Sequence, residues 1–239
     1  MSIPISLPLL NPDTGTYPKF PFQKFEVSAV VSFDDFGQVM VPTEVIPHLY
    51  LSSFQVASDR ELLLQYKIKE ILNVCSEHPC CFPDDFRYMH IKIHDTPLDN
   101  ALGCFDQATE FIHTAVSQRR SVLVHCSAGV SRSATFVIAY LMKIGNISLK
   151  DALMALRAKR GTIMPNYGFL AQLHKEEERL FGQNSITLEQ LYVMYLQYVM
   201  PNKNDKEIID ALRNANNDVR LAFSELMKIS DATVSVTTN

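Results

Sequence analysis

Two patterns of apolar and polar positions alternate along residues 41–182. Four short runs, apolar or alternating, predict strands near residues 45–51, 68–74, 86–93 and 121–125. Apolar residues at helical spacing occupy the intervals between these runs. Strands that alternate with helices are typical of a parallel sheet covered by helices on both faces. The pattern therefore predicts an α/β fold with a mainly parallel central sheet.

Several helix boundaries are marked by capping residues. The run Ser58-Asp59-Arg60-Glu61 has the form of a capping box and predicts the start of a short helix. Apolar spacing predicts another helix over 104–118. Ser148 with Asp151 predicts the start of a third helix, and Gly161 predicts its end.

After Gly182 the pattern contains helices only. Pro201 separates the first of them from the rest, because proline cannot continue a helix. Three starts are predicted, at the capping box of Thr187 and Gln190, at Asp205, and at Asn217-Asp218. We therefore expect a small three-helix bundle over 183–230, followed by a tail over 231–239.

The beginning of the chain has a different composition. Residues 1–40 hold five prolines and little periodicity, which predicts an extended arm. The expected organisation is thus an arm over 1–40, an α/β domain over 41–182, the helical bundle and the tail.

Composition excludes several classes of protein. The 239 residues carry a formal net charge of −4, so nothing indicates a nucleic-acid partner. No apolar run is long enough for a membrane span, and the N-terminus lacks a signal-peptide pattern. Five cysteines with irregular spacing match neither a disulfide framework nor a zinc site. We expect a soluble cytoplasmic protein, with the nucleus left open as a second location.

One segment carries chemistry. The residues from His125 to Arg132 follow the apolar run 121–124 and precede the apolar helical run 134–142. A strand, a tight loop and a helix form a cradle for an anion, because loop amides and the helix N-terminus point at the same place. Here a cysteine, Cys126, precedes the cradle and an arginine ends it.

These residue types suit attack on a phosphate group. The loop amides, the helix dipole and Arg132 favour the thiolate form of Cys126, which is the nucleophilic form. The guanidinium of Arg132 can hold two phosphoryl oxygens. Gly129 lets the backbone bend closely around the anion. The hydroxyl of Ser133 can donate to the Cys126 sulfur as it leaves a phosphorylated intermediate.

The pattern His-Cys, five residues, Arg resembles the signature of the protein tyrosine phosphatase superfamily. The longer run HCSAGVSRSATFVIAYLM is similar to the dual-specificity phosphatases, which include the MAP kinase phosphatases. The likeness extends over residues 41–182, through Val45–Ser52, Ile71–Val74 and Met164–Phe169. It implies a protein phosphatase that acts through a phosphocysteine intermediate, with no metal or other cofactor. The implied phosphate-binding residues are Ser127, Ala128, Gly129, Val130, Ser131 and Arg132.

The resemblance also implies a general acid. The family takes it from an aspartate on a loop before the cysteine. Asp95 lies 31 positions before Cys126, in an Asp-Thr-Pro turn, and matches that position. Asp99 is the alternative on the same loop. His125 has a supporting role in the family, because it hydrogen-bonds the backbone and does not act as a base.

Two weaker resemblances remain open. Cys75 matches the position of a second, redox-active cysteine in the phosphoinositide-phosphatase branch, and a small buried residue is the equal alternative. The C-terminal bundle resembles CUE or ubiquitin-associated domains. Its implied partner is ubiquitin, and its exposed docking residues would be Val199, Met200, Leu226 and Met227.

The substrate class follows from the loop. Its variable positions carry no lysine, so a ligand with several phosphates would lack counter-charges. This favours phosphoproteins carrying phosphotyrosine, phosphoserine or phosphothreonine. The alternative function is that of an adaptor, which would bind phosphoproteins or ubiquitin and have little catalytic activity.

Overall fold

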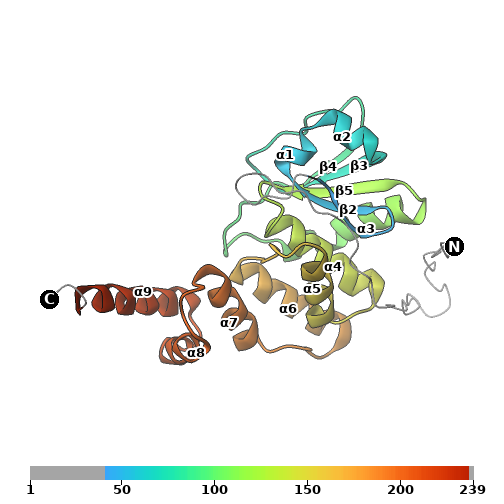
Figure 1. The fold of residues 1–239 in the computed structure, drawn as a ribbon. Coiled ribbons are helices and arrows are strands. Elements are labelled where there is room, and N and C mark those ends of the chain that lie inside the picture. Colours follow the sequence, from blue (N-terminus) through green and yellow to red (C-terminus); the bar gives the residue numbers. More distant parts are fainter. Residues whose placement is uncertain (1–40, 237–239) are drawn as a thin grey trace.

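The structure of the protein, a computed structural model, describes the backbone of residues 41–236 and the side chains of residues 41–228. The predicted arm over 1–40 and the end of the predicted tail, 237–239, lie outside the described residues. Figure 1 shows a central sheet with helices on both faces and a group of helices at the C-terminal end. No helix in the described part is long and apolar enough to cross a membrane.

The sheet has five strands in the order β1-β2-β5-β3-β4. Only the β1–β2 pair is antiparallel, and the other pairs are parallel. This confirms the predicted mainly parallel sheet. The strands are β1 (Thr43–Ile46), β2 (Leu49–Ser53), β3 (Ile68–Asn73), β4 (Arg87–His90) and β5 (Ser121–Cys126).

The sequence pattern was wrong about two strands. The run 45–51 is divided between β1 and β2, because Pro47 and His48, which has φ +71°, reverse the chain there. The run 86–93 forms only the short edge strand β4. Ile91 and Ile93 are buried although the strand ends before them, so their apolar character reflects the core rather than the ladder.

Side-chain alternation places the core on two faces of the sheet. Leu123 of β5 joins a small cluster under α1 (Phe54–Ala57) and α2 (Arg60–Gln65). Val122 and Val124 point the other way, into the main core. Cys126 shares their parity, so it lies on the main-core side at the carboxyl end of β5.

The helices that cover the main-core face surround α4, which is buried along almost its whole length. The predicted helix over 104–118 is confirmed and follows a short 3-10 turn, η1 (Leu102–Cys104). These helices are α3 (Phe105–Ser117), α4 (Arg132–Gly145), α5 (Leu149–Lys159) and α6 (Tyr167–Phe181).

The capping residues are partly as predicted. Ser148 caps α5, and its hydroxyl accepts from the Asp151 amide. The cap of α2 is Asp59 rather than Ser58, because the Asp59 carboxylate accepts from the Leu62 amide while the Ser58 hydroxyl bonds backwards to a carbonyl.

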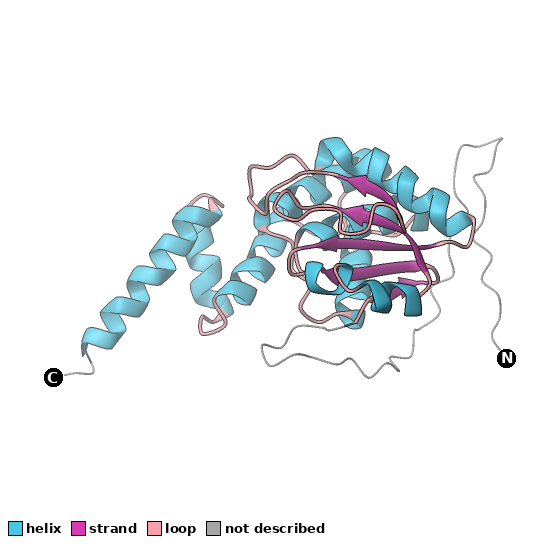
Figure 2. Cartoon of the chain, turned by 90° about the horizontal axis from the view of Figure 1, so that it is seen from above, coloured by secondary structure: helices cyan, strands magenta, loops and turns pink. Residues whose placement is uncertain are grey.

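Three helices follow Gly182, namely α7 (Leu188–Val199), α8 (Asp205–Asn214) and α9 (Val219–Val236). The capping box of Thr187 and Gln190 is present on α7. The cap of α8 is Asn204, one residue before the predicted start. In both views α9 points away from the sheet (Figures 1 and 2), and it continues past residue 230, where the bundle was predicted to end.

Helix α7 contributes to two cores. Leu191 is fully buried in the main core, against which Met194 and Tyr195 also pack. Leu196 lies on another part of the same helix and belongs to a second cluster formed with α8 and α9. The helices after Gly182 are therefore joined to the α/β core by side-chain packing, although the predicted domain division stays a prediction.

We predict that Leu191→Ala lowers the free energy of unfolding of the whole chain. Truncating a fully buried leucine removes contacts and leaves a cavity, so a loss of about 3 kcal/mol is expected. Urea denaturation followed by circular dichroism measures it. Leu221→Ala is the control, because that leucine is 60 % exposed and should change stability by less than about 0.5 kcal/mol. If the loss of stability were confined to a separate transition at low urea concentration, it would contradict a core shared by α7 and the α/β domain.

Candidate active site

The segment from β5 to α4 forms the predicted loop. Cys126 ends the strand, and Arg132 begins the helix. Gly129 has φ +68°, and a Cβ there would lie 2.6 Å from the carbonyl carbon and oxygen of Ser52. Only glycine fits this position, because the left-handed backbone and the close approach to β2 both exclude a side chain.

The Cys126 sulfur lies inside the loop. It accepts a hydrogen bond from the Gly129 amide at 3.3 Å, and the Ser133 hydroxyl lies 3.2 Å away. Both the sulfur and Ser133 are buried at the N-terminus of α4. An amide, a hydroxyl and a helix N-terminus all favour negative charge on the sulfur, so the surroundings suit a thiolate.

Arg132 is buried and paired with a carboxylate that the sequence did not predict. Its two terminal nitrogens donate to Glu77 at 2.6 and 2.5 Å, and one of them also donates to the Ile93 carbonyl at 3.1 Å. These bonds hold the pKa of Glu77 well below its usual range. The Arg132 Nε is buried and has no hydrogen-bond partner among the described residues. It is therefore left to donate to a ligand.

Glu77 lies four residues beyond β3, whose carboxyl end adjoins that of β5. Its carboxylate also accepts from the Ser127 hydroxyl at 2.6 Å. The His78 Nε2 lies 2.7 Å from the same hydroxyl, and the His78 ring stacks on Phe54 with centroids 3.8 Å apart. The only sequence signal was an acidic residue shortly after a buried strand of a parallel sheet.

Asp95 is brought to the same loop. Its carboxylate accepts from the Ser131 hydroxyl at 2.7 Å and from the Asn166 side chain at 2.8 Å, and it lies 3.5 Å from the Arg132 Nε. A Cβ at Gly168 would meet the Pro97 carbonyl oxygen at 2.1 Å, so the Asp95 loop rests directly on the start of α6.

Asp99 has a different environment. It accepts from the Thr96 hydroxyl at 2.6 Å and from the His94 amide at 2.7 Å. The Thr96 hydroxyl, together with His94, lowers the pKa of Asp99. In the described part of the chain, the Asp99 carboxylate therefore closes its own turn. Of the two aspartates, Asp95 is the one that contacts the loop between β5 and α4.

A second buried arginine supports the loop from below. The Arg160 side chain donates to the Gly129 carbonyl at 2.9 Å and the Ala128 carbonyl at 3.3 Å. Burial lowers the pKa of Arg160 to about 10, which leaves it charged at neutral pH. Because these carbonyls bond to Arg160, they face away from the cradle. Sequence reasoning missed Arg160, since only the packing of α5 brings it there.

The remaining predicted residues also lie near the sulfur. His125 is buried, and its Nδ1 lies 3.4 Å from the Cys126 carbonyl. Burial lowers the pKa of His125 to about 4, so the ring is neutral at pH 7. Cys75 is buried and donates to the Asn73 side chain at 3.0 Å. Burial, with a contribution from the Cys126 charge, raises the pKa of Cys75 to about 12.

Comparison of the sequence with known proteins shows which family the chain resembles. The family model "Dual specificity phosphatase, catalytic domain" matches residues 49–179. Human "Dual specificity protein phosphatase 6" is 34% identical over 180 residues, which are 74% of this chain and 47% of that protein. "Dual specificity protein phosphatase 1" of Arabidopsis thaliana is 40% identical over 140 residues, 59% of this chain and 71% of that protein. The chain therefore spans about half the length of the human dual specificity protein phosphatase 6.

Solved structures agree. A mouse putative dual specificity phosphatase complexed with zinc tungstate superposes with a TM-score of 0.57 and 28% identity, covering 68% of this chain and 96% of that one. Human DUSP28 gives a TM-score of 0.56 and 29% identity, covering 58% and 94%. Cys126, Arg132, Asp95 and Glu77 all lie inside the matched residues. The chain therefore belongs to the dual specificity phosphatase family.

Proposed function

We propose that the chain hydrolyses phosphotyrosine and phosphoserine or phosphothreonine on proteins through a phosphocysteine intermediate. The observation that carries the proposal is that Asp95 of a separate segment meets Cys126 and Arg132 at the loop between β5 and α4. The alternative, an adaptor with little activity, is disfavoured because the nucleophile, the cation and the acid occur together.

In the first step the Cys126 sulfur attacks phosphorus, and the bond between phosphorus and the ester oxygen breaks. Asp95 in its protonated form donates its proton to that oxygen. The amides of residues 127–131 and the Arg132 Nε hold the phosphoryl oxygens. This role is supported by the position of the Asp95 carboxylate, which Asn166 and Ser131 hold beside the loop.

In the second step water attacks the phosphocysteine and passes a proton to the Asp95 carboxylate. The sulfur–phosphorus bond breaks, and inorganic phosphate leaves. The Ser133 hydroxyl, 3.2 Å from the sulfur, donates to it as charge returns. Because burial lowers the pKa of His125, its ring stays neutral and takes no proton in either step.

The preference for proteins is part of the proposal. Ala128 and Val130 add no charge to the loop, and the Glu77 carboxylate adds a negative one beside Ser127. The charge of Glu77 is paired with Arg132, so a ligand with several phosphates would find no further counter-charge on these loop side chains.

The proposed redox role of Cys75 requires oxidation of Cys126 to a sulfenic acid by peroxide. The Cys75 thiol would then attack that sulfur, forming a disulfide and releasing water. This chemistry needs a reducing compartment such as the cytoplasm, which stays a prediction.

Cys126→Ser tests the covalent mechanism. A serine hydroxyl is not ionised at neutral pH, so turnover of p-nitrophenyl phosphate should be lost while phosphate binding remains. Steady-state kinetics and inorganic phosphate titration measure the two quantities. Cys104→Ser is the matched control, because that partly buried thiol lies on the turn η1 and hydrogen-bonds the Asn100 carbonyl, so its loss should leave the rate unchanged. A Cys126→Ser rate within about tenfold of the parent would refute the mechanism.

Asp95→Asn tests the acid. Turnover should fall by roughly 10²-fold on an ester with a poor leaving group, and much less when the leaving group is already acidic. The comparison of phenyl phosphate with p-nitrophenyl phosphate gives this difference. Asp99→Asn is the control, because within residues 41–228 the hydrogen bonds of its carboxylate go to its own turn. The same dependence on leaving group in Asp99→Asn and not in Asp95→Asn would reverse the assignment.

A second proposed function is ubiquitin binding by α7–α9. Two of the four expected docking residues are exposed, because Val199 has 37 % and Met227 has 46 % of its surface accessible. The expectation was wrong for Met200 and Leu226, which are buried because they hold the three helices together. Any ubiquitin contact would therefore centre on Val199 and Met227.

We predict that the full chain shifts amide signals of labelled ubiquitin and that a variant with Val199→Asp and Met227→Asp does not. Removing both exposed apolar side chains removes the apolar contact. Leu64→Asp is the control, because that leucine is 40 % exposed on α2, outside the three helices. Unchanged ubiquitin signals at about 1 mM protein would exclude the function.

A further inference from the structure

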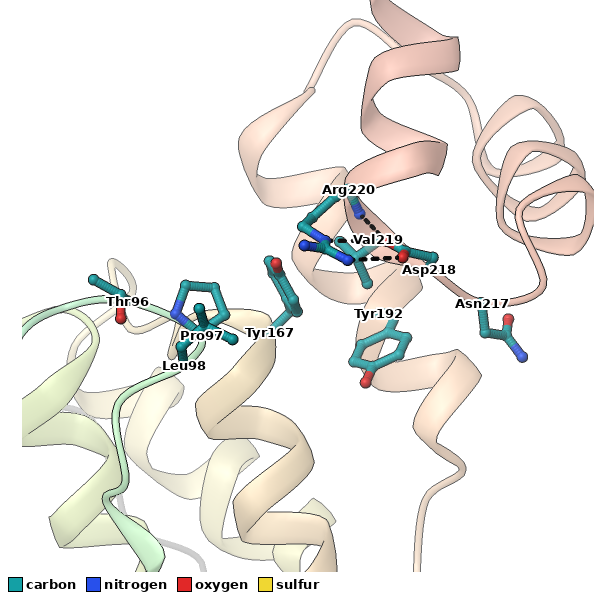
Figure 3. A pocket seen from close by; sticks show the side chains of 9 residues that line it. All are labelled: Thr96, Pro97, Leu98, Tyr167, Tyr192, Asn217, Asp218, Val219 and Arg220. Carbon is teal, nitrogen blue, oxygen red and sulfur yellow. Dashed lines mark hydrogen bonds and ion pairs between the residues drawn. The ribbon is translucent and has the colours of Figure 1, made fainter.

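A groove of about 420 Å³ lies between the Asp95 loop and the C-terminal helices. One wall is formed by Thr96–Leu98 of the loop, and the opposite wall is formed by residues 217–220 at the start of α9. Tyr167 of α6 and Tyr192 of α7 lie between the two walls (Figure 3). We call this space the flanking groove.

The flanking groove begins at the catalytic loop. Thr96 follows Asp95 directly, and Tyr167 follows Asn166, whose side chain donates to Asp95. Neighbouring Cα atoms are about 3.8 Å apart, so the near wall starts within one or two residues of the proposed acid. An extended peptide advances about 3.3 Å per residue. A substrate chain therefore reaches the groove about two to four residues away from its phosphorylated side chain.

The groove offers an apolar contact surface. The Leu98 side chain is 91 % exposed on its wall. The rings of Tyr167 and Tyr192 meet edge to face, with centroids 6.2 Å apart. Arg220 pairs with Asp218 at 3.1 Å on the same rim, so these two charges largely cancel. The surface suits a neutral, large side chain better than an acidic or basic one.

We propose that the flanking groove binds the substrate chain beside the phosphorylated residue and selects phosphoproteins that carry a large aliphatic or aromatic side chain two to four residues away. The inference rests on the proposed phosphatase function. The occupant is the substrate chain because the near wall is continuous with the loop that carries Asp95. The far wall at the start of α9, and Tyr192 of α7 between the walls, follow the family match that ends at residue 179, so the selectivity would belong to this chain.

A phosphopeptide panel tests the inference on the full chain. Phenylalanine, alanine and glutamate are placed in turn at each position from four before to four after one phosphotyrosine. Phenylalanine should raise kcat/KM about tenfold over alanine at one or two positions, and glutamate should not. The rate on p-nitrophenyl phosphate, which is too small to reach the groove, gives the reference.

Leu98→Asp should abolish the preference for phenylalanine, because it places a charge in the apolar wall. Arg220→Trp should do the same from the far wall by filling the groove, at a distance from the Asp95 loop. Its side chain is 74 % exposed, so folding should be unaffected. Leu221→Asp is the matched control, because Leu221 is exposed on the same helix and does not line the groove. That variant should keep the preference.

The outcomes separate this inference from the function on which it rests. A chain that hydrolyses neither p-nitrophenyl phosphate nor any phosphopeptide would overturn the proposed phosphatase function. An active chain with equal kcat/KM across the panel would overturn the groove alone. Loss of the preference in Leu221→Asp, or its retention in Arg220→Trp, would also place the selection elsewhere.

Discussion

The buried charge of Arg132 is the constraint on which the site depends. A guanidinium removed from water is stable only when carboxylates and carbonyls surround it. Two segments meet that need, since Glu77 follows β3, while Ile93 and Asp95 both follow β4. The ends of neighbouring parallel strands are thereby gathered at one point. The Arg132 Nε lies 3.5 Å from Asp95 and has no hydrogen-bond partner in the described part of the chain, so it can still donate a hydrogen bond to an incoming anion.

The second arginine, Arg160, determines which way the backbone carbonyls of the loop point. A tight loop carries amides and carbonyls in equal number, and only the amides help an anion. Arg160 bonds the carbonyls of Ala128 and Gly129 from the core side. The left-handed Gly129 then lets its own amide point at the Cys126 sulfur. One buried cation therefore orients the loop, while the other is the one proposed to hold the phosphoryl group.

The sequence was informative where the chemistry is local. Cys126, Gly129, Arg132 and Ser133 are neighbours in the chain, so strand, loop and helix signals placed them together. Asp95 was found only through family resemblance, because its contact with Ser131 spans 36 positions. Glu77 and Arg160 were missed, since each reaches the loop through the packing of a separate element. Met200 and Leu226 were misjudged for the same reason: residues that look like docking positions became core once three helices packed.

The C-terminal helices contact the edge of the site at Tyr167. Tyr167 directly follows Asn166, whose side chain both caps α6 and donates to Asp95. The Tyr167 ring packs on Tyr192 and Tyr195 of α7, with centroids 6.2 and 5.5 Å apart. Helix α7 thus packs against the first residue of α6, and the residue before it hydrogen-bonds the proposed acid. A helical extension attached at this point therefore supports both proposals, because it borders the flanking groove and packs on the residue next to the one that holds the Asp95 carboxylate.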